Sequence, residues 1–514
     1  MRHLPALIIA IPLASAWIVP LTSLVSAWLA RLISITALMF TTLACYGSLK
    51  HAMTLPGMRW SYTFGGWEAS SHGGIPIGIE HVIDPVSGAL ATLVAALALL
   101  TVLYSGPQIP LRRQVRSGVY HGLLLTLTTG LLGMTITGDL FNLYVFLEIT
   151  ALSAYALLAK TGNRATLASL RYILVGTVAA TFYLIGLGHL YAVTGTLNMA
   201  DLSVRLSQVQ DSRLIGFALI LITLALLTKM AVFPFHSWQS DVYTYAPPMV
   251  IPFIAGTMSK VVAYTLFRLF YTICFVDGSV AHHVARQVLD VVGVVAAISL
   301  VAGSVLAIAQ KDVRRMLAYS STSQISAVAL GLAIGNASAL IGAFTLAANH
   351  AFAKACLFVA VGNFHHRSGA QNIEYLDRLG IRMPLTGIAF TIAALSIMGL
   401  PPTGGFFGKW YLLSGAVEKR AWGYVLAIVV GSLLSAVYFA RVIERLYVGS
   451  FDGTGHSPSR GGTPRKFSKE NLPFLMVAPM AILVIFTILV GFYNYDLVSG
   501  LLQYMLPAGV EWKS

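Results

Sequence analysis

The chain has 514 residues, of which 57% are hydrophobic and only 10% are charged. Soluble domains carry about 25% charged residues, and disordered chains combine low hydrophobicity with high charge, so both classes are excluded. The formal net charge of +14 does not indicate a nucleic-acid partner, because the Lys and Arg residues are scattered in small groups between apolar runs. The composition therefore predicts an integral membrane protein with the lipid bilayer as its surroundings.

Apolar stretches long enough to cross a bilayer, about 20 residues each, predict an all-α fold with about fourteen transmembrane helices. These helices are expected to begin near residues 4, 27, 82, 117, 139, 167, 212, 247, 287, 313, 337, 384, 421 and 472. Cytoplasmic loops carry an excess of Lys and Arg. With the N-terminus outside, the inner loops and their flanks hold about twice as many of these residues as the outer loops. We therefore expect a multi-pass protein of the inner (cytoplasmic) membrane with both termini outside.

Two segments do not have the composition of a transmembrane helix. Residues 48–80 are rich in Gly, Trp and polar residues, which favours an ordered external loop or a hairpin over the first helices. Residues 449–470 have the composition of a flexible linker with a basic end, which we expect on the cytoplasmic side before the last helix.

Weak internal similarity links two parts of the chain about 175 positions apart. The segment GTMSKVVAYTLFRLFY from Gly256 resembles GSLLSAVYFARVIERLY from Gly431. At nearly the same separation, the proline-interrupted stretches LLTKMAVFPFHSW and MGLPPTGGFFGKW each carry a lysine. Broken apolar segments at corresponding positions of two halves are typical of transporters with internal repeats and sites near the middle of the membrane.

Six ionisable residues are predicted to lie at bilayer depth. A charge there costs at least about 2.5–3.5 kcal/mol on insertion scales, and such residues usually belong to ion or proton pathways. The six are Glu148, Lys229, Lys260, His350, Lys354 and Lys409.

The first three of these residues favour function over a structural role. Glu148 lies inside the fifth predicted helix, where a glutamine would serve equally well for bonding neighbouring hydroxyls. Lys229 precedes a proline break, where freed carbonyls and trapped water stabilise a charge, and the middle of an apolar run is a poor place from which to snorkel. Lys260 is similarly deep. If Lys229 alternates between pairing with Glu148 and facing another lysine, it alternately holds and releases a proton.

The other three candidates lie in the second half of the chain. His350 and Lys354 are four residues apart and so share one face of a helix, along which a proton could pass. A buried histidine that is merely satisfied in the core is the alternative. Lys409 follows PPTGGFFG, whose glycines let the helix break and water approach.

The sequence does not favour a cofactor or a metal site. Cys45, Cys274 and Cys356 each stand alone in apolar surroundings, without the pairing that disulfides or iron–sulfur clusters need. The histidine pairs at 282–283 and 365–366 have no third ligand at a metal-like spacing.

Several motifs together resemble one superfamily. In order, they are GDLFNLYVFLE, LLTKMAVFPFHSW, SKVVAY, KDVRRMLAYSSTSQISAVALG, NHAFAKACLF and GLPPTGGFFGKW. They resemble the antiporter-like, proton-translocating subunits of respiratory complex I, of Mrp-type cation/proton antiporters and of membrane-bound hydrogenases, over roughly residues 60–450.

The resemblance implies fourteen helices with two inverted five-helix repeats, helices 4–8 and 9–13, and with helices 7 and 12 broken. The implied organisation is N-terminal helices 1–3 with the external loop in residues 1–115, a first repeat in 116–275, a second in 286–448, the basic linker 449–470 and helix 14 in 471–514. The family's proton-relay residues match the same six positions, which were reached above from the cost of burying charge.

Within the superfamily, lysine at both 260 and 409 looks most like the D-type subunit of Mrp antiporters or the N-type subunit of complex I. One departure is SDVYTYAPPMVIPFIAGTMSK, where relatives show a stretch of small residues before the lysine, and it bears on the packing of the loop between helices 7 and 8.

The leading hypothesis is a proton-translocating subunit of a larger membrane assembly. The first form is an Mrp-type Na⁺(K⁺)/H⁺ antiporter subunit of the D type. The alternative is a pumping subunit of an NADH–quinone oxidoreductase or hydrogenase complex. Its partners would be other membrane subunits. A stand-alone secondary transporter and a subunit that binds quinone directly are the competing hypotheses.

Overall fold

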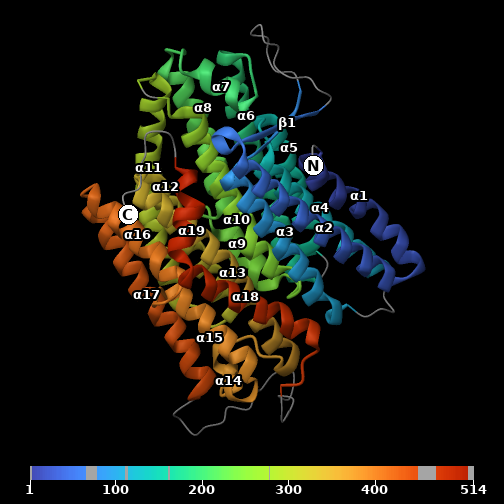
Figure 1. Cartoon of the computed structure of the whole chain (residues 1–514). Helices are drawn as coiled ribbons and strands as arrows, with labels where there is room; N and C mark the ends of the chain where they lie inside the picture. The colour runs from blue at the N-terminus through green and yellow to red at the C-terminus, as the bar shows by residue number, and fades with distance from the viewer. Residues whose placement is uncertain are drawn as a thin grey trace.

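The structure is a computed structural model that describes residues 3–64, 78–109, 114–159, 162–276, 278–449 and 470–506. Helices dominate it, and most of them run between two opposite ends of the molecule (Figure 1). The helices of the first half are α1 (Leu4–Val25), α2 (Ala27–Thr54), α3 (Pro85–Ser105), α4 (Gln114–Ile136), α5 (Leu140–Leu158), α6 (Asn163–Thr194), α7 (Met199–Leu206), α8 (Ser212–Met230), α9 (Ser237–Tyr245) and α10 (Ile251–Phe267). Those of the second half are α11 (Val280–Ile308), α12 (Val313–Ile334), α13 (Ala337–Ser368), α14 (Leu379–Arg382), α15 (Pro384–Met398), α16 (Gly404–Glu418), α17 (Trp422–Tyr447), α18 (Phe474–Phe492) and α19 (Asn494–Gly500).

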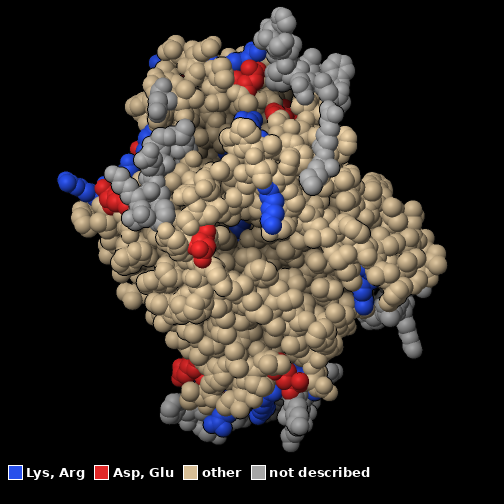
Figure 2. Space-filling view, in the orientation of Figure 1, with Lys and Arg blue, Asp and Glu red and all other residues tan. Residues whose placement is uncertain are grey.

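The predicted membrane-spanning architecture is confirmed. Within the described residues, 13 helices are long and apolar enough to cross a bilayer. The remaining predicted span, near residue 384, is the pair of shorter helices α15 and α16. On the face shown in Figure 2, most of the surface is uncharged, and charged residues form groups at the top and bottom with a few others at mid-height. The two inverted repeats and the domain boundaries stay predictions.

Two of the spanning elements are interrupted in mid-course, where the sequence predicts breaks. The first break separates α8 from α9 and the second separates α15 from α16. Each half-helix before a break ends in a residue with left-handed backbone, Ala231 at φ 59° and Gly399 at φ 86°. Each break also contains a cis X-Pro peptide, Phe233-Pro234 and Pro401-Pro402. Proline lacks the N–H that would continue the helix ladder, so both helices must restart beyond it.

The predicted hairpin over the first helices is present. Strands β1 (Trp60–Thr63) and β2 (Glu80–Ile83) pair antiparallel, at the same end of the molecule as α7 (Figure 1). The Glu80 carbonyl accepts a hydrogen bond from the Gly138 N–H at 2.8 Å, and its carboxylate accepts one from the Asn198 amide at 2.8 Å. The hairpin therefore packs on the α4–α5 turn and the start of α7. Most of the predicted linker 449–470 lies outside the described residues.

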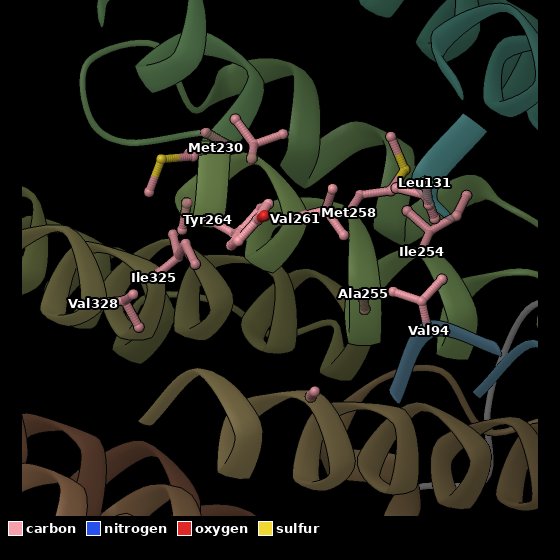
Figure 3. Packing of buried hydrophobic residues seen from close by; sticks show 14 of the residues in the cluster. Val94, Leu131, Met230, Ile254, Ala255, Met258, Val261, Tyr264, Ile325 and Val328 are labelled. Carbon is pink, nitrogen blue, oxygen red and sulfur yellow. The ribbon is translucent and has the colours of Figure 1, made fainter. Parts of the chain in front are cut away.

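α10 lies at the centre of the helix bundle, and all of its residues are buried. Figure 3 shows Ile254, Met258 and Val261 of α10 in the packed core, with Val94 of α3 and Leu131 of α4 nearby. α8, α12 and α13 also contact α10. A charged residue on α10 therefore lies inside the helix bundle.

Candidate proton-relay site

Lys229 lies in the last turn of α8, just before the first break, and is 8% exposed. Its Nζ makes no hydrogen bond to any described residue. Gly176 of α6 faces it closely: a Cβ at Gly176 would lie 3.4 Å from Lys229 Nζ and 1.9 Å from the Tyr155 hydroxyl. Only glycine leaves room for both polar groups there, so α6 is built to admit the ammonium and the phenol at one point.

Glu148 lies on α5, and the nearby α5 residues Leu147 and Thr150 line one small cavity together with Lys229. No ion pair within 4.0 Å joins the two, although both residues are among those described. Buried Oε1 of Glu148 also has no hydrogen-bond partner there. The structure thus shows the pair apart, and the predicted alternation of Lys229 between partners stays a prediction.

A small cavity joins Lys229 to α10. It is lined by Lys229 together with Thr150, Tyr172, Met258 and others, and it offers about 10 Å³ for water centres. That space is on the order of what one water needs. A single water at this point would give Lys229 Nζ the hydrogen-bond partner that the described residues do not provide.

Lys260, His350 and Lys354 form the centre of the site. All three are at most 2% exposed, and α10, which carries Lys260, packs against α13, which carries His350 and Lys354. The two lysines each donate to a backbone carbonyl, Lys260 to Ala255 in its own helix and Lys354 to Leu317 of α12 at 3.0 Å. Both ring nitrogens of His350 lack a partner among the described residues. A neutral imidazole without a hydrogen-bond partner is suited to accept a proton from a nearby lysine.

Lys409 lies on α16, after the second break, and is half-buried. Its Nζ donates to the carbonyl oxygens of Ile397 and Met398, both at 2.9 Å, at the C-terminal end of α15. These carbonyls have no helical partner, and the negative end of the helix dipole favours a cation there. The break itself therefore creates the binding position of this lysine.

The structure adds polar residues that the sequence did not single out. Asn349 of α13 is 1% exposed and accepts a hydrogen bond from Ser396 at 2.6 Å, beside the second break. Near the first break, buried Gln239 accepts from Thr322 of α12 at 3.0 Å and donates to Tyr243 at 3.1 Å. Uncharged polar residues are common in helices, so sequence alone carries no signal that separates these from ordinary core residues.

The six predicted residues thus fall into three groups: Glu148 with Lys229, then Lys260 with His350 and Lys354, then Lys409. Among the described residues, no group of three or more His, Cys, Asp or Glu side chains is placed to hold a metal ion. The arrangement is suited to passing protons between buried bases and lysines, with water filling the gaps.

Comparison with known proteins identifies the family. The family model described as "NADH:quinone oxidoreductase/Mrp antiporter, TM" matches residues 137–435, a stretch that contains all six candidates. The chain belongs to this family of membrane subunits.

Relatives within this family extend over most or nearly all of the chain. The N-type subunit of the NADH-quinone oxidoreductase of Desulforudis audaxviator is 44% identical over 508 residues, covering 98% of this chain and 99% of the relative. The D-type subunit of the Na(+)/H(+) antiporter of Bacillus subtilis is 31% identical and covers 78% of this chain and 79% of its own.

Solved structures of the family agree with this fold. A chain of the archaeal membrane-bound sulfane sulfur reductase has a TM-score of 0.87 at 28% identity, with 98% of both chains covered. A chain of the Mrp complex from Dietzia has a TM-score of 0.85 at 25% identity, covering 97% of this chain and 96% of its own. A chain of respiratory complex I from Thermus thermophilus has a TM-score of 0.74 at 25% identity, covering 96% and 98%. The multi-subunit membrane architecture is therefore common to these neighbours.

Proposed function

We propose that this chain is a proton-translocating subunit of a multi-subunit membrane complex and that Glu148, Lys229, Lys260, His350, Lys354 and Lys409 carry the proton. The observation that supports it most is the row of buried ionisable groups on α5, α8, α10, α13 and α16, most of them with little or no exposed surface. Burying several lysines in a membrane bundle costs more free energy than burying apolar side chains of similar size. A function in moving charge accounts for this cost.

The first candidate for the assembly is an Mrp-type Na⁺(K⁺)/H⁺ antiporter, with this chain in the position of the D-type subunit. The high structural similarity to a chain of the Mrp complex supports it. The second candidate is a redox-driven complex. Two findings favour it: the 44% identical relative is named as a subunit of an NADH-quinone oxidoreductase, and the sulfane sulfur reductase chain matches over 98% of its length.

The decisive experiment measures proton movement in sealed vesicles that contain the native complex. Lys229→Ala and Glu148→Ala should each lower translocation by about 100-fold or more, the range that removal of a proton-transfer group produces. Lys311→Ala, in the α11–α12 connection, is the matched control and should leave translocation unchanged. Unchanged translocation in Lys229→Ala would falsify the proposal.

The same vesicles separate the two assemblies. An antiporter collapses an imposed pH gradient when Na⁺ or K⁺ is added, without an electron donor. A redox-driven complex builds a pH gradient across the vesicle membrane only when its electron donor and acceptor are supplied. Purification of the native complex then shows which membrane subunits accompany the chain, and activity of the purified chain alone would point to a stand-alone transporter instead.

We further propose that the hairpin end faces outward and that both termini lie on that side of the inner membrane. The excess of Lys and Arg in the loops of the opposite end supports this orientation. A reporter that is active only in the cytoplasm, fused after Ser514, should be inactive. An active reporter contradicts the orientation.

A further inference from the structure

A cavity of about 300 Å³ lies beside Lys260, between α3, α10, α12, α13 and α18. Its lining is almost entirely apolar, with Lys260 as the charged member among the described residues. Ala89 of α3 and Ala263 and Tyr264 of α10 belong to the wall of this cavity. Apolar cavities stay dry, so Lys260 meets water through this cavity only if the cavity opens toward one end of the molecule.

An ion pair lies at the hairpin end of the cavity, just beyond its lining residues Val86 and Tyr264. Arg268, two turns beyond Lys260 and directly after the last residue of α10, pairs through Nη2 with the carboxylate of Asp84, which immediately precedes α3. The side chains are only 13% and 17% exposed. The pair therefore ties together the ends of two helices that form walls of the cavity.

Both partners are held in place by further hydrogen bonds. Arg268 Nε donates to the Tyr264 hydroxyl at 2.6 Å, and this hydroxyl donates to the Thr135 carbonyl at the end of α4 at 2.8 Å. The Asp84 carboxylate accepts from the Ser87 N–H at 2.9 Å as the N-cap of α3. The hairpin strand β2 leads directly into Asp84 and fixes its position.

The charge of Asp84 is stabilised although the group is buried. Burial alone would raise the pKa of the Asp84 carboxyl, but the Arg268 guanidinium and the bonds with Ser87 more than offset this and hold the pKa below its usual value. From Arg268 onward, residues Arg268–Cys274 form a π-helix, a distortion often found at functional positions in helices. The chain thus places an ion pair and an irregular turn at one point beyond Lys260.

We propose that Asp84 and Arg268, positioned by Tyr264, form a gate that closes the Lys260 cavity at the hairpin end. With the pair formed, Lys260 exchanges protons with His350 and Lys354 but not with water on that side. With the pair broken, α3 and α10 separate at this end and water reaches the cavity. The role of the gate in proton translocation rests on the proposed function, because an open gate would let protons cross without passing through the relay residues.

The test measures water access to the cavity rather than transport. Ala263→Cys is placed in the full complex after Cys45, Cys274 and Cys356 are replaced by alanine. A thiol reagent that does not cross the bilayer is added in turn to each face of sealed vesicles. Labelling should be slow with the pair intact.

Asp84→Asn keeps the N-cap but removes the charge. It should raise the labelling rate by about tenfold or more, the factor that loss of a charge-assisted hydrogen bond gives. The increase should occur from one face only, the face of the hairpin.

Two further variants separate a gate from general loosening. Asp139→Asn changes another N-cap aspartate at the same end, one with no ion pair among the described residues, and should leave the rate unchanged. The charge exchange Asp84→Arg with Arg268→Asp should restore slow labelling. An unchanged rate in Asp84→Asn, an equal increase in Asp139→Asn or labelling from the opposite face overturns the proposal.

If Asp84→Asn does not assemble, Arg268→Lys takes its place, with an intermediate rate expected and an unchanged rate contradicting the gate. Because labelling requires no proton transport, its result stands whether or not Lys229→Ala abolishes translocation. The failure of the gate and the failure of the proposed function are therefore distinguishable. In vesicles, an open gate should also raise the passive leak of protons, and this leak should fall again in the charge exchange.

Discussion

The two broken helices place their lysines on opposite sides of the break. Lys229 lies on the half-helix before the first break, and its Nζ has no hydrogen-bond partner among the described residues. Lys409 lies on the half-helix after the second break, and its Nζ donates to two carbonyl oxygens at the end of α15. The two breaks are alike in the backbone, but only the second supplies hydrogen-bond acceptors to its lysine.

The difference lies in what the break offers each ammonium. At the second break, unpaired carbonyls and the helix dipole hold the cation directly. At the first break, the groups around Lys229 are Glu148, Tyr155 and a small cavity with room for water. Lys229 Nζ makes no hydrogen bond to any described residue there. We infer that Lys229 is free to change partner, whereas Lys409 is tied to one position.

The largest expected difference in stability is between removing the Lys409 ammonium group and removing that of Lys229. Lys409→Met leaves the carbonyls of Ile397 and Met398 without their donor and should destabilise the protein by about 1–3 kcal/mol. Lys229→Met removes a buried charge with no bonded partner and should be neutral or slightly stabilising. Thermal denaturation of the purified complex in detergent measures both. Equal losses of stability would show that the two lysines are held alike.

A smaller effect is expected from the polar supports of each break. The Phe233 N–H donates to the Ser299 hydroxyl at 2.8 Å, and the Ser396 hydroxyl donates to Asn349 at 2.6 Å. Ser299→Ala leaves the partly buried Phe233 N–H unpaired, so it should cost about 1–2 kcal/mol. Asn349→Ala should cost less, because the Ser396 hydroxyl can turn to another acceptor. Denaturation midpoints of the two variants measure these losses of stability. A larger loss in Asn349→Ala than in Ser299→Ala would contradict the expected order.

The smallest effect concerns the residue that ends each first half-helix. Ala231 has left-handed backbone, which costs a residue with a Cβ about 1–2 kcal/mol, whereas the second break has Gly399 in the same role. Ala231→Gly should therefore raise stability by about 0.5–1 kcal/mol after the entropy cost of glycine. Gly399→Ala should lower it, since its Cβ would meet Lys409 Cδ at 2.9 Å. Denaturation midpoints that move the other way contradict this assignment.

Much of the fold could be predicted because the membrane makes the sequence pattern simple. The predicted helix starts agree with the structure to within seven residues at every spanning element, and both breaks lie where proline and glycine interrupt apolar runs. The cost of burying charge was enough to single out all six candidate residues. Each of these inferences depends on one local segment and its surroundings in lipid.

The remaining features depend on contacts between distant segments. Asp84 and Arg268 are separated by 184 positions, and nothing in either segment indicates the other. Arg268 is paired and mostly buried in this contact. The distance between Glu148 and Lys229 depends on how α5 and α8 are packed, which no local pattern records. Burying uncharged residues such as Asn349 and Gln239 costs less free energy than burying a charge, so the sequence does not distinguish them from other polar core residues.

The complete burial of α10 determines how the bilayer acts on the site. With every residue of this helix buried, lipid does not contact the segment that carries Lys260. Changes in bilayer thickness or lipid composition therefore act on α10 only after the surrounding helices have tilted or shifted. The central lysine is therefore shielded from direct contact with lipid, and the helices around α10 transmit any effect of the membrane to it.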